Sequence, residues 1–429
     1  MLRLLYALFV RLAAAPAALF LALRGRRQGD APGRWAERFG WVPRPAGPVT
    51  VWLHAASLGE VVAARPLIDA LIARHGSGGV WITTMTTSGS QAVRRYWGDA
   101  VPHSYVPFDL PRALRRFLRR VRPQVCVVLE TEIWPHLFTL LARRRIPLML
   151  ANARLSPRSF SGYRRVRGAI AGVLSRVALV AAQSDADAER FRALGAPHVE
   201  RAGNIKFDLA PPEHERAIGQ RWRADVGPRP VWVAASTHDG EEAAVLAAHR
   251  DLLRWHPKAL LVLVPRHPQR FASVARMLER DGWHFVRRGD GDTVSVPAEA
   301  TLLLGDSTGE MFRYLAMADC AFVGGSLVEV GGHNILEPAA LGLPVLFGQH
   351  MFHFVDARRL LIETGGAREV ASAQDLAVEI AALFAQPELR TEMGTAAAAA
   401  VAANRGAVER HLALLDEARA SWPPEGAGR

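Results

Sequence analysis

The chain of 429 residues is too long for one compact core, and half of its residues are hydrophobic, so two or more domains are expected. The net charge of +12 comes almost entirely from arginine, because Lys206 and Lys258 are the only lysines. Such a balance suits a surface that meets phosphates or anionic lipid headgroups. Nucleic acid is not an expected partner, since no recognised binding module and no interleaving of aromatic with basic residues accompanies the charge.

An apolar segment opens the chain. Residues 4–23 are nearly all apolar, but Arg11 and Pro16 interrupt them, and a cluster of arginines follows by residue 27. A membrane-spanning helix needs about 20 apolar residues, and a central arginine costs roughly 2.5–3.5 kcal/mol. Residues 1–27 are therefore predicted to form a marginal spanning helix or a helix in the membrane interface. A cleaved signal peptide fits less well, because the basic cluster follows the apolar run.

From residue 49 onward, apolar runs alternate with helical patterns. Buried strands are predicted in the first half at 49–53, 80–84, 124–129, 148–151 and 177–182. The stretch from Phe207 to Pro212 breaks the alternation and is predicted to be a linker. Further strands are predicted at 231–235, 260–264, 301–304 and 320–323.

Alternation of this kind predicts parallel sheets covered by helices on both faces. The chain is therefore expected to be an α/β protein with one Rossmann-like domain at 28–210 and a second at 211–405, facing each other across a cleft. A final helix and a tail are expected at 406–429.

Glu60 follows the first predicted strand, where a loop of small residues leads into a helix. Open α/β sheets bind ligands at such strand ends, although a glutamate here could also merely complement the helix dipole. Glu130 and Glu132 follow another strand, and one of the two is expected to be a solvated residue. Lys206 precedes the linker, within reach of the cleft. A carboxylate base opposite a cation suits transfer to a hydroxyl, because the base takes the proton and the cation stabilises developing negative charge.

Three loops at strand ends of the second half carry groups that favour phosphate binding. The glycine-rich stretch 324–332 leads to Asn334, a predicted helix N-cap, and to Glu337, which could accept hydrogen bonds from ribose hydroxyls. The other two loops contain Gly309–Met311 and the cationic pair Arg266-His267. By itself the glycine-rich loop could be a tight turn, but three such loops on one domain favour a nucleotide site.

No metal site and no cofactor are predicted. Asp185 and Asp187 form an acidic pair of a kind that can bind metals, but Ser184 or Asp185 is better placed to cap the helix that follows. Cys126 and Cys320 lie far apart in apolar runs, so burial is expected for both. Clustered histidine and cysteine ligands are not found in the sequence.

Eight motifs, taken together, resemble the 3-deoxy-D-manno-octulosonic acid (Kdo) transferases of Gram-negative lipopolysaccharide synthesis. The match runs from the apolar N-terminus to about residue 405. The motifs are HAASLGE at 54–60, LETEIWP at 129–135, NARLS at 152–156, GNIKFD at 203–208, STHDGEE at 236–242, PRH at 265–267, GEM at 309–311 and GGHNILE at 331–337.

The resemblance implies a metal-independent GT-B glycosyltransferase with CMP-Kdo as donor and a lipid A precursor as acceptor. It would act at the cytoplasmic face of the anionic inner membrane. Glu60 would be the general base, and Glu130 and Lys206 would stabilise the transition state. The residues that would hold CMP are Arg266, His267, Gly309, Glu310, Met311, Asn334, Ile335, Leu336 and Glu337.

Two alternatives stay open. One is a GT-B transferase that uses another nucleotide sugar. The other is a membrane-tethered module that binds a nucleotide without catalysis.

Overall fold

The computed structural model describes residues 34–289 and 295–422, together with residues 6–8, 10–12, 16 and 21. Most of the predicted membrane-associated segment, residues 1–27, therefore lies outside the described residues. Within the described part, no helix combines the length and the apolar character needed to cross a bilayer. The chain divides into two compact units, Met1–Asp208 with Arg405–Arg429, and Leu209–Asn404.

The first unit is built on a seven-stranded parallel sheet with the order β3-β2-β1-β4-β5-β6-β7. The chain leaves β1 in one direction for β2 and β3 and returns on the other side as β4, so the carboxyl ends of β1 and β4 flank a topological switch point. The strands are β1 Val51–His54, β2 Val80–Thr84, β3 His103–Tyr105, β4 Val125–Leu129, β5 Leu148–Ala153, β6 Leu179–Ala182 and β7 Val199–Arg201.

Helices cover both faces of this sheet, because successive strand side chains point to opposite faces. Trp52 belongs to a buried cluster that includes residues of α5, α6, α8 and α9, whereas Leu53 belongs to a second cluster that includes residues of α2, α3, α4 and α18. The helical segments are η1 Arg34–Phe39, α2 Leu58–Ala63, α3 Arg65–His75, η2 Ser77–Gly79, α4 Thr87–Trp97, α5 Pro111–Val121, α6 Pro135–Arg143, α7 Pro157–Arg164, α8 Arg167–Leu174, α9 Asp185–Ala193, η3 Ile205–Asp208 and α18 Ala407–Ala420.

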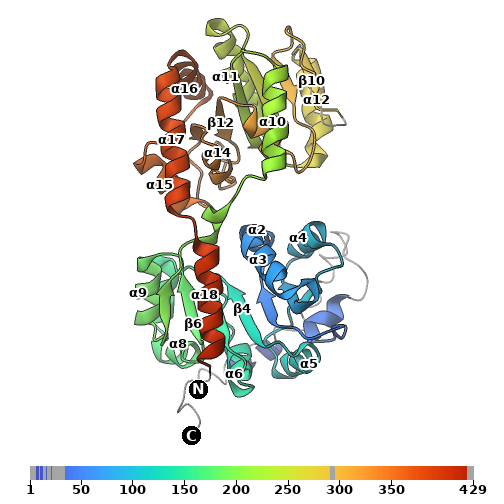
Figure 1. Ribbon diagram of the computed structural model, residues 1–429, viewed down its shortest axis with the longest axis vertical. Coiled ribbons are helices and arrows are strands. Elements are labelled where there is room, and N and C mark those ends of the chain that lie inside the picture. Colours follow the sequence, from blue (N-terminus) through green and yellow to red (C-terminus); the bar gives the residue numbers. More distant parts are fainter. Residues whose placement is uncertain are drawn as a thin grey trace. The chain divides into compact units, whose positions relative to one another are not determined.

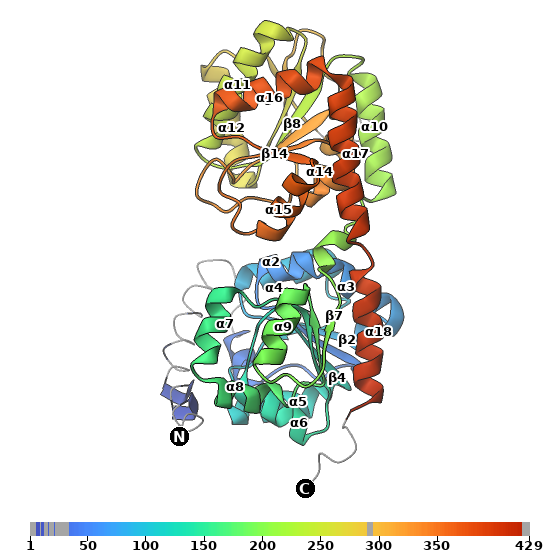
Figure 2. The same ribbon diagram turned by 90° about the vertical axis from the view of Figure 1, so that its left-hand side faces the viewer.

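The last helix, α18, belongs to the first unit although it follows the whole of the second unit in sequence. It packs against α3, β5, β6 and the turn η3 (Figures 1 and 2). Ala407, Leu415 and Ala418 are buried in the same core as Leu53. The sequence pattern predicted this helix but did not indicate where it packs.

The second unit repeats the architecture with the order β10-β11-β9-β8-β12-β13-β14, again with every pair parallel. Its switch point lies between β8 and β12. The strands are β8 Val231–Thr237, β9 Leu260–Pro265, β10 Phe285–Arg287, β11 Leu302–Leu304, β12 Cys320–Val323, β13 Val345–Phe347 and β14 Ala367–Glu369.

Helices again form two layers. Trp232 belongs to a buried cluster on one face that includes residues of α11, α12, α16 and α17, and Val233 belongs to a cluster on the other face that includes residues of α10 and α13. The helical segments are α10 Glu213–Asp225, α11 Glu241–Trp255, η4 Pro268–Arg270, α12 Phe271–Arg280, α13 Met311–Ala316, α14 Leu336–Ala340, α15 Val355–Glu363, α16 Ala373–Ala385 and α17 Pro387–Ala403. The predicted pair of parallel α/β sheets is confirmed.

Candidate functional site

Glu60 lies at the switch point of the first sheet, in the first turn of α2. Ser57 caps this helix, because its Oγ accepts a hydrogen bond from the Glu60 N–H at 3.3 Å and also donates to Glu60 Oε1 at 3.1 Å. The Ala56 N–H donates to Glu60 Oε2 at 2.7 Å. The carboxylate therefore folds back over its own helix start as in a capping box, which fixes its direction.

The same carboxylate is electrostatically unusual. Burial raises the pKa of Glu60 from its ordinary value to about 7, and the nearby negative charges of Glu130 and Glu132 act in the same direction. Hydrogen bonds from Ala56 and Ser57 oppose the shift without cancelling it. A carboxylate that titrates near neutral pH is suited to take up a proton during a reaction. A glutamate that only complements the helix dipole would keep a lower pKa and would be a weaker base.

Glu130 and Glu132 behave differently from each other. Glu130 directly follows β4 and has a φ of 56°, in the left-handed region that non-glycine residues seldom occupy. Such strain is found where a site demands a particular side-chain direction. Among the described residues no hydrogen-bond partner is assigned to the Glu130 carboxylate, whereas Glu132 Oε2 accepts a hydrogen bond from Trp134 Nε1 at 2.8 Å. Glu130 is thus the better candidate for contact with a substrate.

Lys206 is carried by the short turn η3, which a network of amide side chains holds in place. Asn152, buried at the end of β5 with a φ of 50°, accepts a hydrogen bond from the Ile205 N–H at 3.1 Å. Asn204 Oδ1 accepts from the Lys206 N–H at 3.0 Å. Asn152 is a further candidate for a functional residue, and its only signal in the sequence is its place in the NARLS motif.

The switch point of the second sheet is occupied by the protein itself. Glu241, fully buried at the start of α11, accepts backbone hydrogen bonds from Gly325 at 2.6 Å, Ser326 at 3.0 Å and Leu327 at 2.9 Å. It also accepts one from the His238 N–H at 2.9 Å. These donors of the glycine-rich loop were expected to favour a phosphate, but a carboxylate of the same unit already occupies them.

Arg266 and His267 follow β9, next to the switch point, and both side chains are exposed. Their neighbours are histidines that the sequence analysis did not select. His238 and His333 approach to 2.8 Å between their Nε2 atoms, and the ring of His267 lies edge-on to His238 at 5.1 Å. Burial, with the charge of Arg266 as a second cause, lowers the pKa of His333 to about 3. The group is therefore a set of neutral histidine donors and acceptors beside an exposed guanidinium.

The segment from Asn334 to Glu337 lies near the same arginine. Burial raises the pKa of Glu337, although part of its side chain stays exposed, and both a hydrogen bond from Asn334 and the charge of Arg266 oppose the rise. Asn334 is not the N-cap residue that was predicted, since α14 is capped at Ile335 and begins at Leu336. Its Oδ1 nevertheless accepts a hydrogen bond from the Leu336 N–H at 3.2 Å, so it still satisfies a free donor at the helix start.

Gly309–Met311 follow β11 and therefore lie at the carboxyl ends of the parallel strands, as Arg266 does after β9. Glu310 is held by two arginines, at 2.9 Å from Arg288 and at 2.6 Å from Arg313, and accepts a hydrogen bond from Ser307. Its charge is therefore compensated inside the unit by Arg288 and Arg313. The backbone of this loop, rather than the Glu310 carboxylate, is the part suited to a ligand.

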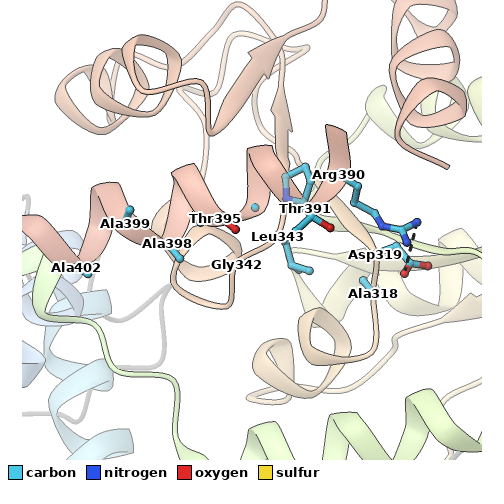
Figure 3. A pocket seen from close by; sticks show the side chains of 12 residues that line it. Ala318, Asp319, Gly342, Leu343, Arg390, Thr391, Thr395, Ala398, Ala399 and Ala402 are labelled. Atoms are coloured by element: carbon cyan, nitrogen blue, oxygen red, sulfur yellow. Dashed lines mark ion pairs between the residues drawn. The ribbon is translucent and has the colours of Figure 1, made fainter. Parts of the chain in front are cut away.

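The second unit also contains a hollow whose lining residues, drawn in Figure 3, include none from these loops. Small residues of α17 line it, together with Asp319 and Gly342. These two residues precede β12 and β13, so the hollow lies at the amino-terminal ends of the strands. Arg390 reaches Asp319 at 4.0 Å across it, and Arg223 contacts the same carboxylate at 3.3 Å. This hollow is separate from the candidate nucleotide site.

The acidic pair in α9 has a structural role. Ser184 is the N-cap and accepts a hydrogen bond from the Asp187 N–H at 3.2 Å, while buried Asp187 accepts from the Leu155 N–H at 2.8 Å. Cys126 and Cys320 are both buried free thiols, as predicted. Within the described parts of the chain, no group of three or more acidic, histidine or cysteine side chains is arranged to hold a metal ion. Metal independence stays a prediction.

Comparison with known proteins agrees with the motifs. A family model described as 3-deoxy-D-manno-octulosonic-acid transferase (kdotransferase) matches residues 33–209. The 3-deoxy-D-manno-octulosonic acid transferase of Haemophilus influenzae is 42% identical over 89% of this chain and 90% of its own length. That of Bordetella pertussis is 37% identical over 93% of this chain and 95% of its own length.

A solved glycosyltransferase from Rickettsia africae, 11% identical, covers 87% of this chain and 99% of its own, with a TM-score of 0.54. At that identity the likeness concerns the fold alone, and it agrees with two parallel-sheet domains of the GT-B kind. The two relatives match nearly from end to end at high identity, so this chain belongs to the 3-deoxy-D-manno-octulosonic acid transferase family of glycosyltransferases.

Proposed function

We propose that this protein transfers Kdo from CMP-Kdo to a hydroxyl of a lipid A precursor, with Glu60 as the general base and without a metal ion. The observation that carries the proposal is Glu60 itself. It is a largely buried carboxylate at a switch point, its direction is fixed by Ser57 and Ala56, and its pKa is raised to about 7. Membership of the Kdo transferase family indicates that the transferred group is Kdo.

In this reaction the acceptor hydroxyl oxygen forms a bond to the anomeric carbon of Kdo while the bond from that carbon to the phosphate oxygen of CMP breaks. CMP leaves with the electron pair of that bond, and Glu60 takes the hydroxyl proton. The anomeric carbon gains positive character on the way, and the carboxylate of Glu130 stabilises it. Lys206 stabilises the negative charge that develops as the bonds rearrange.

We assign donor binding to the second unit. Arg266 supplies a guanidinium for the phosphate, and His267 is an exposed neighbour that can donate a further hydrogen bond. Glu337 accepts hydrogen bonds from the ribose hydroxyls, and Asn334 fixes its side chain through a 3.2 Å hydrogen bond. The backbones of Gly309–Met311 and of Ile335 and Leu336 complete the assignment. Acceptor binding and the proton transfer belong to the first unit.

We further propose that residues 1–27 hold the enzyme at the cytoplasmic face of the inner membrane. The support is the apolar run from residue 4 to residue 23 and the arginines that follow it, which favour retention on the cytoplasmic side. Anionic lipids would add to the attraction, since the chain carries a net charge of +12.

The decisive experiment combines purified protein, CMP-Kdo and a lipid A precursor. CMP should appear only when both substrates are present, and the mass of the lipid product should rise by a whole number of Kdo units. That number also answers how many are added in succession. EDTA should leave the rate unchanged. Release of UDP from a UDP-sugar, or donor binding without turnover in the presence of acceptor, would refute the assignment.

A further inference from the structure

The helix α18 holds the segment that carries Lys206 at three points. Before the segment, Arg410 Nε donates a hydrogen bond to the Ala202 carbonyl at 2.8 Å. At its end, the Val408 N–H donates to the carboxylate of Asp208. The close approach is visible at Gly203, whose φ is +84° and where an added Cβ would lie 2.9 Å from the Arg410 guanidinium. A helix from the far end of the chain thus borders the whole GNIKFD motif.

The third point is a relay through the interior. His411, which is 1% exposed, accepts a hydrogen bond at Nε2 from the Asn152 N–H at 2.8 Å. Asn152 Oδ1 in turn accepts from the Ile205 N–H at 3.1 Å, next to Lys206. His411 Nδ1 lies 2.6 Å from the Ala407 carbonyl, so that nitrogen must carry the proton and Nε2 must be the acceptor.

We infer that His411 is a positioning residue for Lys206, acting through Asn152, and that α18 is therefore a working part of the first unit's site. The inference rests on the role proposed above for Lys206. Beyond that role, we infer which groups fix the position and orientation of the turn η3.

The physical reason lies in the backbone of Asn152. Its φ of 50° places its N–H toward α18 and its side chain toward η3, a conformation that Asn tolerates better than other non-glycine residues. If His411 cannot accept a hydrogen bond, a buried N–H is left without a partner, which proteins avoid by rearranging the backbone. Rotation of the Asn152 peptide would move the Oδ1 that holds Ile205, and Lys206 would move with it.

The test compares two substitutions at one position. His411→Gln keeps an acceptor oxygen near the position of Nε2, whereas His411→Leu fills similar space without one. Leu415→Ala is the matched control, because Leu415 is buried in the same helix at 3% exposure and no hydrogen bond joins its side chain to η3. All three are made in the full chain, and Leu415→Ala reports what a general loosening of α18 does.

Hydrogen exchange gives a readout that does not depend on catalysis. Amide protons of the peptide 203–208 should exchange at least about tenfold faster in His411→Leu than in the wild type, and near the wild-type rate in His411→Gln. Equal protection in both variants would overturn the inference, whatever the protein's activity proves to be.

Kinetics then tests the link to Lys206. His411→Leu should lower kcat by about tenfold to a hundredfold with little change in KM for the donor, because a small displacement of a catalytic group is costly. His411→Gln should restore most of the rate, and Leu415→Ala should keep it. In a Lys206→Ala background, adding His411→Leu should lower kcat by less than about twofold. Additive losses would refute the relay, whereas a wild-type protein that transfers no Kdo would refute the proposed function instead.

Discussion

Glu60→Gln is the sharpest perturbation that the first unit offers. Gln keeps an oxygen that can accept the hydrogen bond from the Ala56 N–H, which lies 2.7 Å from the carboxylate in the wild type, and it removes only the titrating group. The pKa of Glu60 is raised from 4.5 to about 7, so the folded state holds its proton more tightly than the unfolded chain does. Stability is therefore lost as the pH rises from the unfolded value through the folded one.

The size of that loss follows from the shift. One pKa unit corresponds to about 1.4 kcal/mol, so the ionised carboxylate of the folded protein costs about 3 kcal/mol above pH 8 and almost nothing below pH 4. Glu60→Gln should consequently match the wild type in free energy of unfolding at pH 4 and exceed it by about 3 kcal/mol at pH 8. Activity should move in the opposite direction, with a loss of roughly a hundredfold or more in kcat.

Denaturant unfolding from pH 4 to 8.5 checks the first expectation, and the pH dependence of kcat/KM checks the second. In the wild type kcat/KM should rise about tenfold between pH 6 and pH 8, as expected for a base with a pKa of about 7. Glu189→Gln is the control, since Glu189 is exposed on α9. A stability difference that does not vary with pH would refute the burial argument. Retention of more than a tenth of the activity would refute the assignment of the base.

Three further predictions concern other parts of the molecule. Arg266→Ala should weaken CMP-Kdo binding about tenfold to a hundredfold in calorimetry, because a charge-assisted contact to phosphate is lost. The control Arg276→Ala, at another exposed arginine, should leave this binding unchanged. An effect confined to acceptor binding would contradict the donor assignment. Glu241→Ala should lower the free energy of unfolding by about 3 kcal/mol or more, since four backbone N–H groups lose their acceptor, whereas a loss below about 1 kcal/mol would show that the loop relaxes freely. Burial lowers the pKa of His411 to about 4, so wild-type stability should fall relative to His411→Gln as the pH drops from 6.5 towards 4, by up to about 3 kcal/mol; parallel curves would contradict that shift.

Burial explains which strands could be predicted. The core strands β1, β4 and β9 are buried along their whole length and have long apolar runs, which made them visible in the sequence. The strands that were missed, such as β3 and β10, contain three residues each. β3 and β10 lie at sheet edges, and strands of three residues that include His103, Ser104 or Arg287 contain no apolar run that would mark them.

The candidate site was predictable where a residue's role depends on its place after a strand, and not where it depends on a distant partner. Glu60 and Arg266 follow strands that flank or adjoin a switch point. Because ligands bind at the carboxyl ends of such strands, these positions can be predicted as candidate site residues. Three of the four hydrogen bonds to Glu241 come from a loop 84 to 86 residues away. The hydrogen bond between Asn152 and His411 joins residues 259 positions apart, and no local pattern reports such contacts.

The placement of α18 has a consequence for how the chain is made. Because the first unit comprises Met1–Asp208 and Arg405–Arg429, the second unit is an insertion within it. During synthesis the insertion can complete its own sheet early, whereas the turn that carries Lys206 lacks three of its hydrogen-bonded supports until Val408, Arg410 and His411 have been added. A chain that ended before α18 would therefore hold a complete second unit and a first unit without the hydrogen bonds from α18 to Ala202, Asn152 and Asp208.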